Sequence, residues 1–179
     1  MLPSIILLVG EANSGKSATL RTLVEKYLDK TKGKRENFFE YNGKGICIYP
    51  SSPQENSDNP FCNSQKIIES IDRRISECNL NNCTLLITTF TLKGDQKTGE
   101  SLNEPCIEIP IQNLSKHFKV QVVYLKQNGS RSKSPRALNR LKRIDNLMQR
   151  LKNYEIESHN DQEKRQADEL WDIVMKVDS

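Results

Sequence analysis

Histidine is scarce in this sequence, and long apolar runs are missing. The 179 residues include only two histidines, His117 and His159, and their wide separation argues against a histidine-based metal site. No stretch approaches the roughly 20 apolar residues that span a bilayer, so we expect no membrane segment. The apolar run near the N-terminus lacks a preceding basic segment and leads into glycine, which argues against a signal peptide.

The cysteines are odd in number and form no C-x-x-C pair. Paired zinc ligands and disulfide frameworks both leave regular cysteine spacings, and none is present here. We therefore expect reduced thiols in a cytoplasmic protein, with neither zinc nor disulfides. The five residues are Cys47, Cys62, Cys78, Cys83 and Cys106.

Acidic residues are nearly absent from one segment, residues 126–152. It holds nine Lys or Arg against a single acid, Asp145, so it carries a net charge of +8. Because the whole chain has a formal net charge of +4, the other residues sum to −4. A mildly basic total therefore conceals one strongly basic element on an acidic body.

The hydrophobic pattern predicts an α/β fold. Short apolar runs bounded by turn residues predict buried strands at 4–9, 45–49, 83–90 and 120–125. An edge strand is expected at 106–111, where isoleucines alternate. Two aromatic-rich runs flank Asn42-Gly43, which predicts an antiparallel hairpin near residues 37–49.

Between these strands, apolar residues recur at helical spacing. Helices are expected after Lys16, at 67–78, at 113–118, from Ser134-Pro135 to Leu151, and near the C-terminus. The apolar face of the fourth helix is Leu138, Leu141, Ile144, Met148 and Leu151. Strands that alternate with helices imply a mostly parallel sheet, here of four to five strands, with helices on both faces. We expect a single domain over residues 1–179, built as a three-layer sandwich.

One octapeptide, GEANSGKS, follows the first predicted strand and precedes an amphipathic helix. Residues 10–17 match the pattern G-x-x-x-x-G-K-[ST]. Glycine lets the backbone approach an anion closely, and the loop amides together with the positive end of the next helix then point at phosphate oxygens. The residues that follow the apolar strand therefore predict an anion-binding loop at its carboxyl end.

By this motif and its flanks, the chain resembles the P-loop NTPases and is most similar to their small nucleoside and nucleotide kinases. The resemblance implies ATP or another nucleoside triphosphate as ligand, with Mg²⁺. Lys16 would neutralise the β- and γ-phosphates, and the Ser17 hydroxyl would coordinate the metal. The expected nucleotide-binding residues are Gly10, Asn13, Ser14, Gly15, Lys16, Ser17 and Ala18.

The sequence departs from this family at the third buried strand. A P-loop NTPase is expected to carry Asp or Glu there, which holds Mg²⁺ through water. This strand ends instead in Thr88-Thr89-Phe90-Thr91, and the nearest acid, Asp95, lies beyond Gly94. The departure argues against ATPase and GTPase activity. Two interpretations of Thr88 and Thr89 are open. One of these threonines orients a metal-bound water, or they simply satisfy backbone groups.

The kinase branch accommodates this departure better. Glu55, with Asp58 as an alternative, falls where such kinases carry the acid that orients the acceptor hydroxyl. Arg136 and Arg140 share one helix face within the basic segment 126–152, which corresponds to an arginine-rich lid over the phosphates. The resemblance thus implies transfer of the γ-phosphoryl group to a nucleoside, nucleotide or other small acceptor.

Two rival interpretations stay open. Residues 131–150 also suit a helix that tracks a nucleic-acid backbone, which would make the chain a nucleotide-binding module or ATPase of a nucleic-acid complex. The second interpretation is a regulator that holds a nucleotide without turnover. Arg73 and Arg74, on the second predicted helix, would hold an acceptor phosphate or lie on the surface. The oligomeric state is not encoded in any of these patterns.

Overall fold

The computed structural model describes residues 2–11, 14–28, 37–52, 64–92, 105–127, 135–158 and 163–177. The candidate residues Asn13, Glu55 and Asp58 lie outside these ranges. Arg136 and Arg140 lie within the range 135–158, but only their backbone is described. The described strands are β1 (Ser4–Glu11), β2 (Phe38–Tyr41), β3 (Lys44–Tyr49), β4 (Cys83–Leu92), β5 (Val120–Gln127) and β6 (Tyr154–Ser158). The helices are α1 (Lys16–Tyr27), α2 (Ser64–Leu80), α3 (Pro105–His117), α4 (Pro135–Leu151) and α5 (Glu163–Val177).

The strands form one six-stranded sheet in the order β2-β3-β4-β1-β5-β6. All neighbouring pairs are parallel except β2 and β3. The sheet order places β1 in the interior, between β4 and β5, so its carboxyl end opens between two other strands. The predicted α/β class and mostly parallel sheet are confirmed, whereas the strand count is six rather than four to five.

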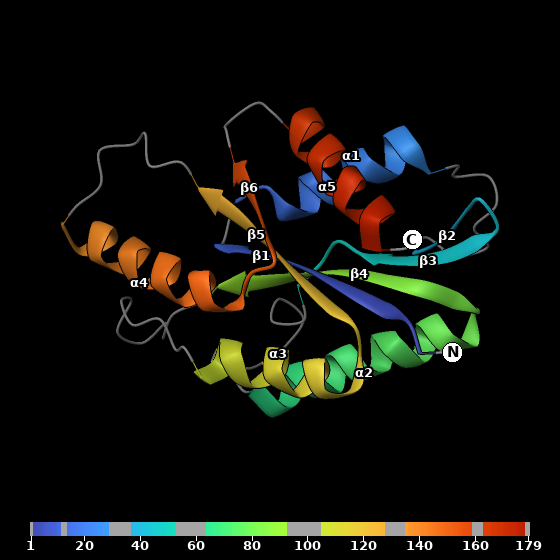
Figure 1. Cartoon of the computed structure of the whole chain (residues 1–179), viewed down its shortest axis with the longest axis horizontal. Coiled ribbons are helices and arrows are strands. Elements are labelled where there is room, and N and C mark those ends of the chain that lie inside the picture. Colours follow the sequence, from blue (N-terminus) through green and yellow to red (C-terminus); the bar gives the residue numbers. More distant parts are fainter. Residues whose placement is uncertain are drawn as a thin grey trace.

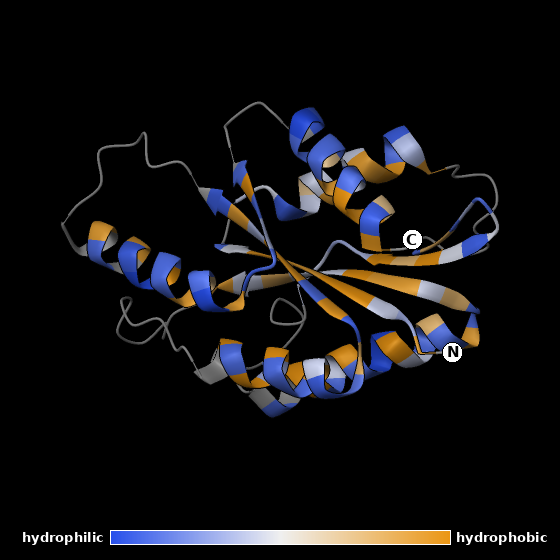
Figure 2. Cartoon of the chain, in the orientation of Figure 1, coloured by the Kyte–Doolittle hydropathy of each residue, from blue (hydrophilic) through white to orange (hydrophobic). Residues whose placement is uncertain are grey.

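Helices cover both faces of this sheet. Figure 1 shows α1 and α5 side by side on one face, with α2, α3 and α4 on the other. The core divides accordingly: Ile6 and Leu8 of β1 pack toward α1 and α5, whereas Ile5, Leu7 and Val9 pack toward the opposite helices. Strands buried on both faces read as continuous apolar runs, which explains the sequence of β1 and the orange central strands of Figure 2.

The predicted hairpin is confirmed. Strands β2 and β3 pair antiparallel, and Asn42 and Gly43 take φ values of 49° and 77° between them. Positive φ at both central residues is the requirement of the tight turn that Asn-Gly favours. Strand β3 then pairs with β4 in parallel, so it joins the hairpin to the main sheet.

The predicted edge strand at 106–111 is wrong, because these residues begin α3. Ile107, Ile111 and Leu114 are buried, whereas Ile109 is 42% exposed. A strand would have placed all three isoleucines on one face, but the burial follows the i, i+4, i+7 spacing of a helix. The separate short helix predicted at 113–118 is the C-terminal part of the same element.

Two further corrections concern the C-terminal half. Strand β6 was not predicted, and it pairs parallel with β5 at the edge of the sheet. Leu138, expected on the apolar face of α4, is 49% exposed, whereas Ile144, Leu147 and Met148 are buried against the sheet. Helix α4 therefore packs through its C-terminal half.

Candidate functional site

The turn from β1 to α1 is held together by a lysine ammonium. Lys16 is only 5% exposed, and its Nζ donates to the carbonyl oxygens of Gly10 at 3.2 Å and Glu11 at 2.6 Å. It also reaches Ser14 Oγ at 3.3 Å, while the Ser14 amide donates to the Glu11 carbonyl at 3.3 Å. The positive charge therefore lies within the loop, against the end of β1.

Two glycines make this turn sterically feasible. A Cβ on Gly10 would lie 2.6 Å from Ser14 Oγ and 3.0 Å from the carbonyl oxygen of Leu125 on β5. Gly15 precedes the helix as its N-cap, with φ 85° and ψ 6°, a conformation that L side chains rarely adopt. The first and last glycines of the octapeptide therefore serve different needs, close approach and left-handed backbone.

Helix α1 begins directly at this turn. Its first regular backbone bond runs from the Thr19 amide to the Gly15 carbonyl, at 2.8 Å. The amides of the first turn, which here belong to Lys16, Ser17 and Ala18, precede that bond, as at any helix N-terminus. Such a turn favours negative charge through both its amides and the helix dipole. No acid stands among the first-turn residues of α1, all of which the structure describes.

Gln166 of α5 supports the loop from the side, although no sequence pattern singles it out. Thr19 Oγ1 lies 3.0 Å from the Gly15 carbonyl and 2.9 Å from Gln166 Oε1. Both side chains are buried, Thr19 fully and Gln166 almost so. A Cβ on Gly15 would come within 3.7 Å of the same Gln166 oxygen. The amide side chain therefore fixes the start of α1 from an element near the other end of the chain.

Polar groups from β3 and β4 meet the turn at the same edge of the sheet. Ser17 is half-buried, and its hydroxyl donates to the Pro50 carbonyl at 2.7 Å. Thr89 Oγ1 donates to that same carbonyl oxygen at 3.1 Å. Thr89 therefore satisfies a backbone carbonyl, which is the second of the two interpretations given for the threonines. Thr88 Oγ1 accepts a bond from Arg74.

Arg74 and Arg73 have different environments. Arg73 is exposed, but Arg74 is only 5% exposed and donates from Nη1 to the Ser51 carbonyl at 3.0 Å. Its guanidinium also lies 4.8 Å from the centre of the Tyr49 ring. The surface interpretation is therefore wrong for Arg74, which anchors the residues that follow β3.

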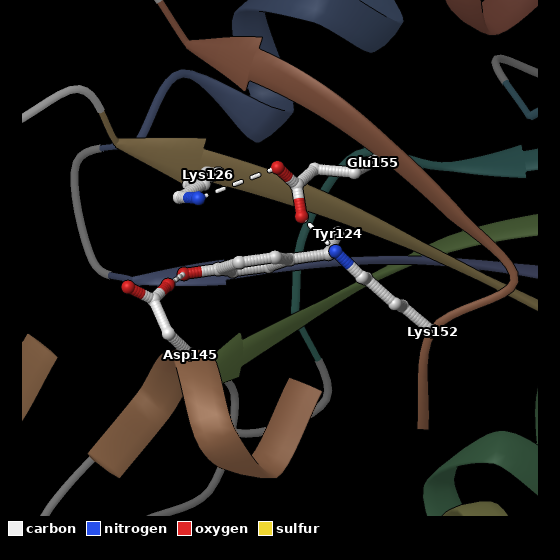
Figure 3. A network of polar contacts seen from close by, with 5 residues as sticks. All are labelled: Tyr124, Lys126, Asp145, Lys152 and Glu155. Carbon is white, nitrogen blue, oxygen red and sulfur yellow. Dashed lines mark hydrogen bonds and ion pairs between the residues drawn. The ribbon is translucent and has the colours of Figure 1, made fainter. Parts of the chain in front are cut away.

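The basic segment is partly neutralised where the structure describes it. Figure 3 shows Glu155 of β6 between Lys126 and Lys152, and both lysines bond to it, Lys126 at 3.4 Å. Arg150 pairs with Glu108 at 2.9 Å. The hydrogen bond from Lys152 is the main cause of the lowered pKa of Glu155. Lys142 and Arg143 remain exposed on α4.

The same network fixes α4 beside β5. The Tyr124 hydroxyl donates to Asp145 Oδ1 at 3.2 Å, as Figure 3 shows. Burial, followed by the charge of Asp145, raises the pKa of Tyr124, so the phenol stays protonated as a donor. Tyr124 lies opposite Val9 of β1 in the sheet register. Helix α4 is thereby held beside β5, which is the neighbour of the strand that carries the glycine-lysine turn.

Glu155→Gln tests this network through pH. Because the folded-state pKa of Glu155 is lowered, its stabilising contribution is present above the unfolded pKa of about 4.3 and is lost as pH falls through the lower folded value. We expect the variant to lose roughly 0.5 kcal/mol of unfolding free energy at pH 7 and a smaller amount at pH 3. Urea unfolding at both pH values measures the difference, and an equal loss at both would contradict the assignment.

Outside this turn, the described residues form no disulfide, no cluster of metal ligands and no membrane-spanning helix. The cysteines described there, Cys47, Cys78 and Cys83, are free and buried. Within the described residues no group of three or more His, Cys, Asp or Glu is arranged to hold a metal ion. No helix in those same ranges has the length and apolar character to cross a membrane.

The candidate site is thus the β1–α1 turn together with the polar groups around Pro50. Gly10, Ser14, Gly15, Lys16 and Ser17 all lie in or beside the turn, as expected from the sequence, and Ala18 lies in the first turn of α1. No protein-family model matches this sequence, and no curated protein is significantly similar to it.

Proposed function

We propose that this chain binds ATP at the β1–α1 turn and transfers its γ-phosphoryl group to a small acceptor. The observation that supports this best is the Lys16 ammonium, held inside a glycine-flanked loop at the N-terminus of a helix. A triphosphate carries several negative charges in a row. Helix amides, a left-handed glycine and one buried cation are the groups that recognise such a tail.

The location of the turn also supports a ligand site. The connection from β1 leads to α1 on one face of the sheet, whereas the connection from β5 leads to α4 on the opposite face. In open α/β sheets, ligands bind in the crevice outside the carboxyl ends of strands where such connections diverge. The glycine-lysine turn stands at that point.

Mg²⁺ would enter this site with the nucleotide. The metal prefers oxygen ligands, keeps several waters, and takes only one or two groups from the protein in addition to phosphates. The half-buried Ser17 hydroxyl, at the start of α1, is a group of this kind. When bound, Mg²⁺ would neutralise phosphate charge, and Lys16 would do the same from the loop.

Kinase chemistry is favoured over hydrolysis for two reasons. The strand next to β1 carries Thr88 and Thr89 near its carboxyl end instead of the acid that manages metal and water, and Thr89 already donates to the Pro50 carbonyl. The lid-like basic segment starts from β5, the other neighbour of β1. In this proposal, Glu55 or Asp58 positions the acceptor, and Arg136 with Arg140 closes the site. Closure matters because an open site transfers phosphate to water.

The nucleic-acid interpretation of the basic helix receives less support. On the helix itself Arg150 bonds to Glu108, and the flanking Lys126 and Lys152 bond to Glu155, so these three cations of the basic segment already have carboxylate partners. If the helix nonetheless gripped nucleic acid, affinity would fall steeply with salt and weaken on Arg140→Glu.

Incubation with γ-labelled ATP and a panel of nucleosides, nucleotides and oligonucleotide ends tests the proposed activity. We expect label on one acceptor class with the native chain and none with Lys16→Ala. Label released only as inorganic phosphate would instead indicate an ATPase. ATP binding without transfer to any acceptor would favour the regulator without turnover.

A further inference from the structure

The carbonyl oxygen of Pro50 accepts two side-chain hydroxyls at once. Ser17 donates from α1 at 2.7 Å, and Thr89 donates from β4 at 3.1 Å. A carbonyl oxygen has two lone pairs, so these two donors use its full capacity. Pro50 has no amide hydrogen of its own, which leaves this oxygen as its only backbone hydrogen-bonding group.

The bond to Pro50 determines how the Ser17 oxygen is presented. A serine hydroxyl has one proton and two lone pairs, and its proton rotates toward the best acceptor. With that proton on Pro50, the lone pairs of Ser17 Oγ point elsewhere, available to a cation. A hydroxyl that donated its proton toward the ligand would instead repel a metal. The Pro50 carbonyl therefore selects the orientation of the Ser17 hydroxyl that leaves its lone pairs available to Mg²⁺.

The segment that carries this acceptor is held by side chains on both sides. Arg74, buried on α2, donates to the Ser51 carbonyl at 3.0 Å and bonds Thr88 of β4. Ser52 is fully buried, and its Oγ accepts the Thr91 amide at 3.2 Å. Pro50 and Ser52 are thereby bonded to β4 and Ser51 to Arg74, which sets the place of the Pro50 oxygen.

From these contacts we infer that the Pro50 carbonyl, held in place by Thr89, orients Ser17 for Mg²⁺ beside a strand that carries no acid: it accepts the proton of Ser17 so that this hydroxyl can ligate the metal. This inference rests on the proposed nucleotide site. Thr89 is then a positioning residue that acts through Pro50 and Ser17. This arrangement also explains why threonines can stand where the family resemblance leads one to expect a carboxylate.

Thr89→Val tests the inference, because valine keeps the shape of threonine and removes the hydroxyl. The measured quantity is the ratio of ADP dissociation constants in EDTA and in Mg²⁺, obtained by calorimetry. We expect Thr89→Val to reduce this ratio about 3- to 10-fold, as the loss of one neutral hydrogen bond implies, while ADP affinity in EDTA stays the same. Thr89→Ser, which keeps a donor, should preserve the native ratio.

Thr84→Val is the matched control. Thr84 lies at the opposite end of β4, and its hydroxyl also meets a backbone carbonyl, that of Gly45 at 3.5 Å. This variant should leave the Mg²⁺ ratio at the native value. If Thr89→Val does not fold, Thr89→Ser and Thr89→Ala, which differ by one oxygen, provide the same comparison.

The outcomes separate this inference from the proposed function. A native chain that binds ADP more tightly with Mg²⁺, and a Thr89→Val variant with an unchanged ratio, would overturn the inference and leave the nucleotide site intact. A native chain that binds no nucleotide in either buffer would overturn both. A lowered ratio restored by serine would support the role of the Pro50 acceptor.

Discussion

Lys16→Ala is expected to weaken ATP binding at least about 100-fold. The ammonium is the only cation of the β1–α1 turn among its described residues, and it lies against the Gly10 and Glu11 carbonyls, inside the loop. A hydrogen bond to a charged group is worth about 1.5–3 kcal/mol, and a lysine in this position would reach more than one phosphate oxygen. Calorimetric titration with ATP and Mg²⁺ measures the loss.

Lys26→Ala provides the control for this variant. Lys26 belongs to the last turn of the same helix, where its Nζ contacts Asp168 at 2.5 Å on the surface. Removal of this exposed charge should change ATP affinity by no more than about twofold. Equal ATP affinity in Lys16→Ala and in the native chain would refute the assignment of the loop.

Gly10→Ala is expected to weaken ATP binding about 10-fold or more and to lower the unfolding free energy by about 1–3 kcal/mol. The new methyl group would stand 2.6 Å from Ser14 Oγ and 3.0 Å from the Leu125 carbonyl. The serine can rotate, but the backbone of β5 cannot yield without disturbing the sheet. Since Ser14 contacts the Lys16 ammonium, its displacement also moves the charge. Urea unfolding and ATP titration measure the two effects.

Gly43→Ala separates a local clash from the general effect of losing a glycine. Gly43 also has a positive φ, of 77°, but no atom lies within 4 Å of the position its Cβ would take. This variant should cost about 1–2 kcal/mol of stability through backbone strain alone and leave ATP affinity unchanged. If Gly10→Ala behaves like Gly43→Ala, the close approach of loop and sheet is not needed for binding.

The interior strands were predictable from sequence because both faces of each are buried. Strand β6 was not, since its sequence is YEIES and only Ile156 is buried among its described side chains. An edge strand with so few apolar residues resembles a polar loop. The isoleucines at 107, 109 and 111 fit both a strand and a helix, and only the sheet against which Ile107 and Ile111 pack decides between them.

The residues of the candidate site divide in the same way, into those that the sequence singles out and those that only the fold brings to the turn. Its contiguous part, the glycine-lysine turn and the start of α1, could be singled out from sequence because the backbone requirements of a tight strand-to-helix turn are encoded locally. Gln166 and the Pro50 carbonyl were not selected, because they reach the turn only through the fold. Arg74 was named only for an acceptor phosphate or the surface, and its contact with Ser51 also depends on the fold. A backbone oxygen leaves no trace in the residue type that carries it. The Pro50 oxygen that accepts Ser17 and Thr89 therefore became apparent only once β3 and β4 were placed side by side.

The central claim is that the β1–α1 turn captures a triphosphate. Calorimetric titration of the native chain with ATP, and separately with GTP, in Mg²⁺ buffer tests it most directly. We predict saturable heat with one site per chain for at least one of the two nucleotides. A folded protein that gives no binding heat with either nucleotide would contradict the proposed function.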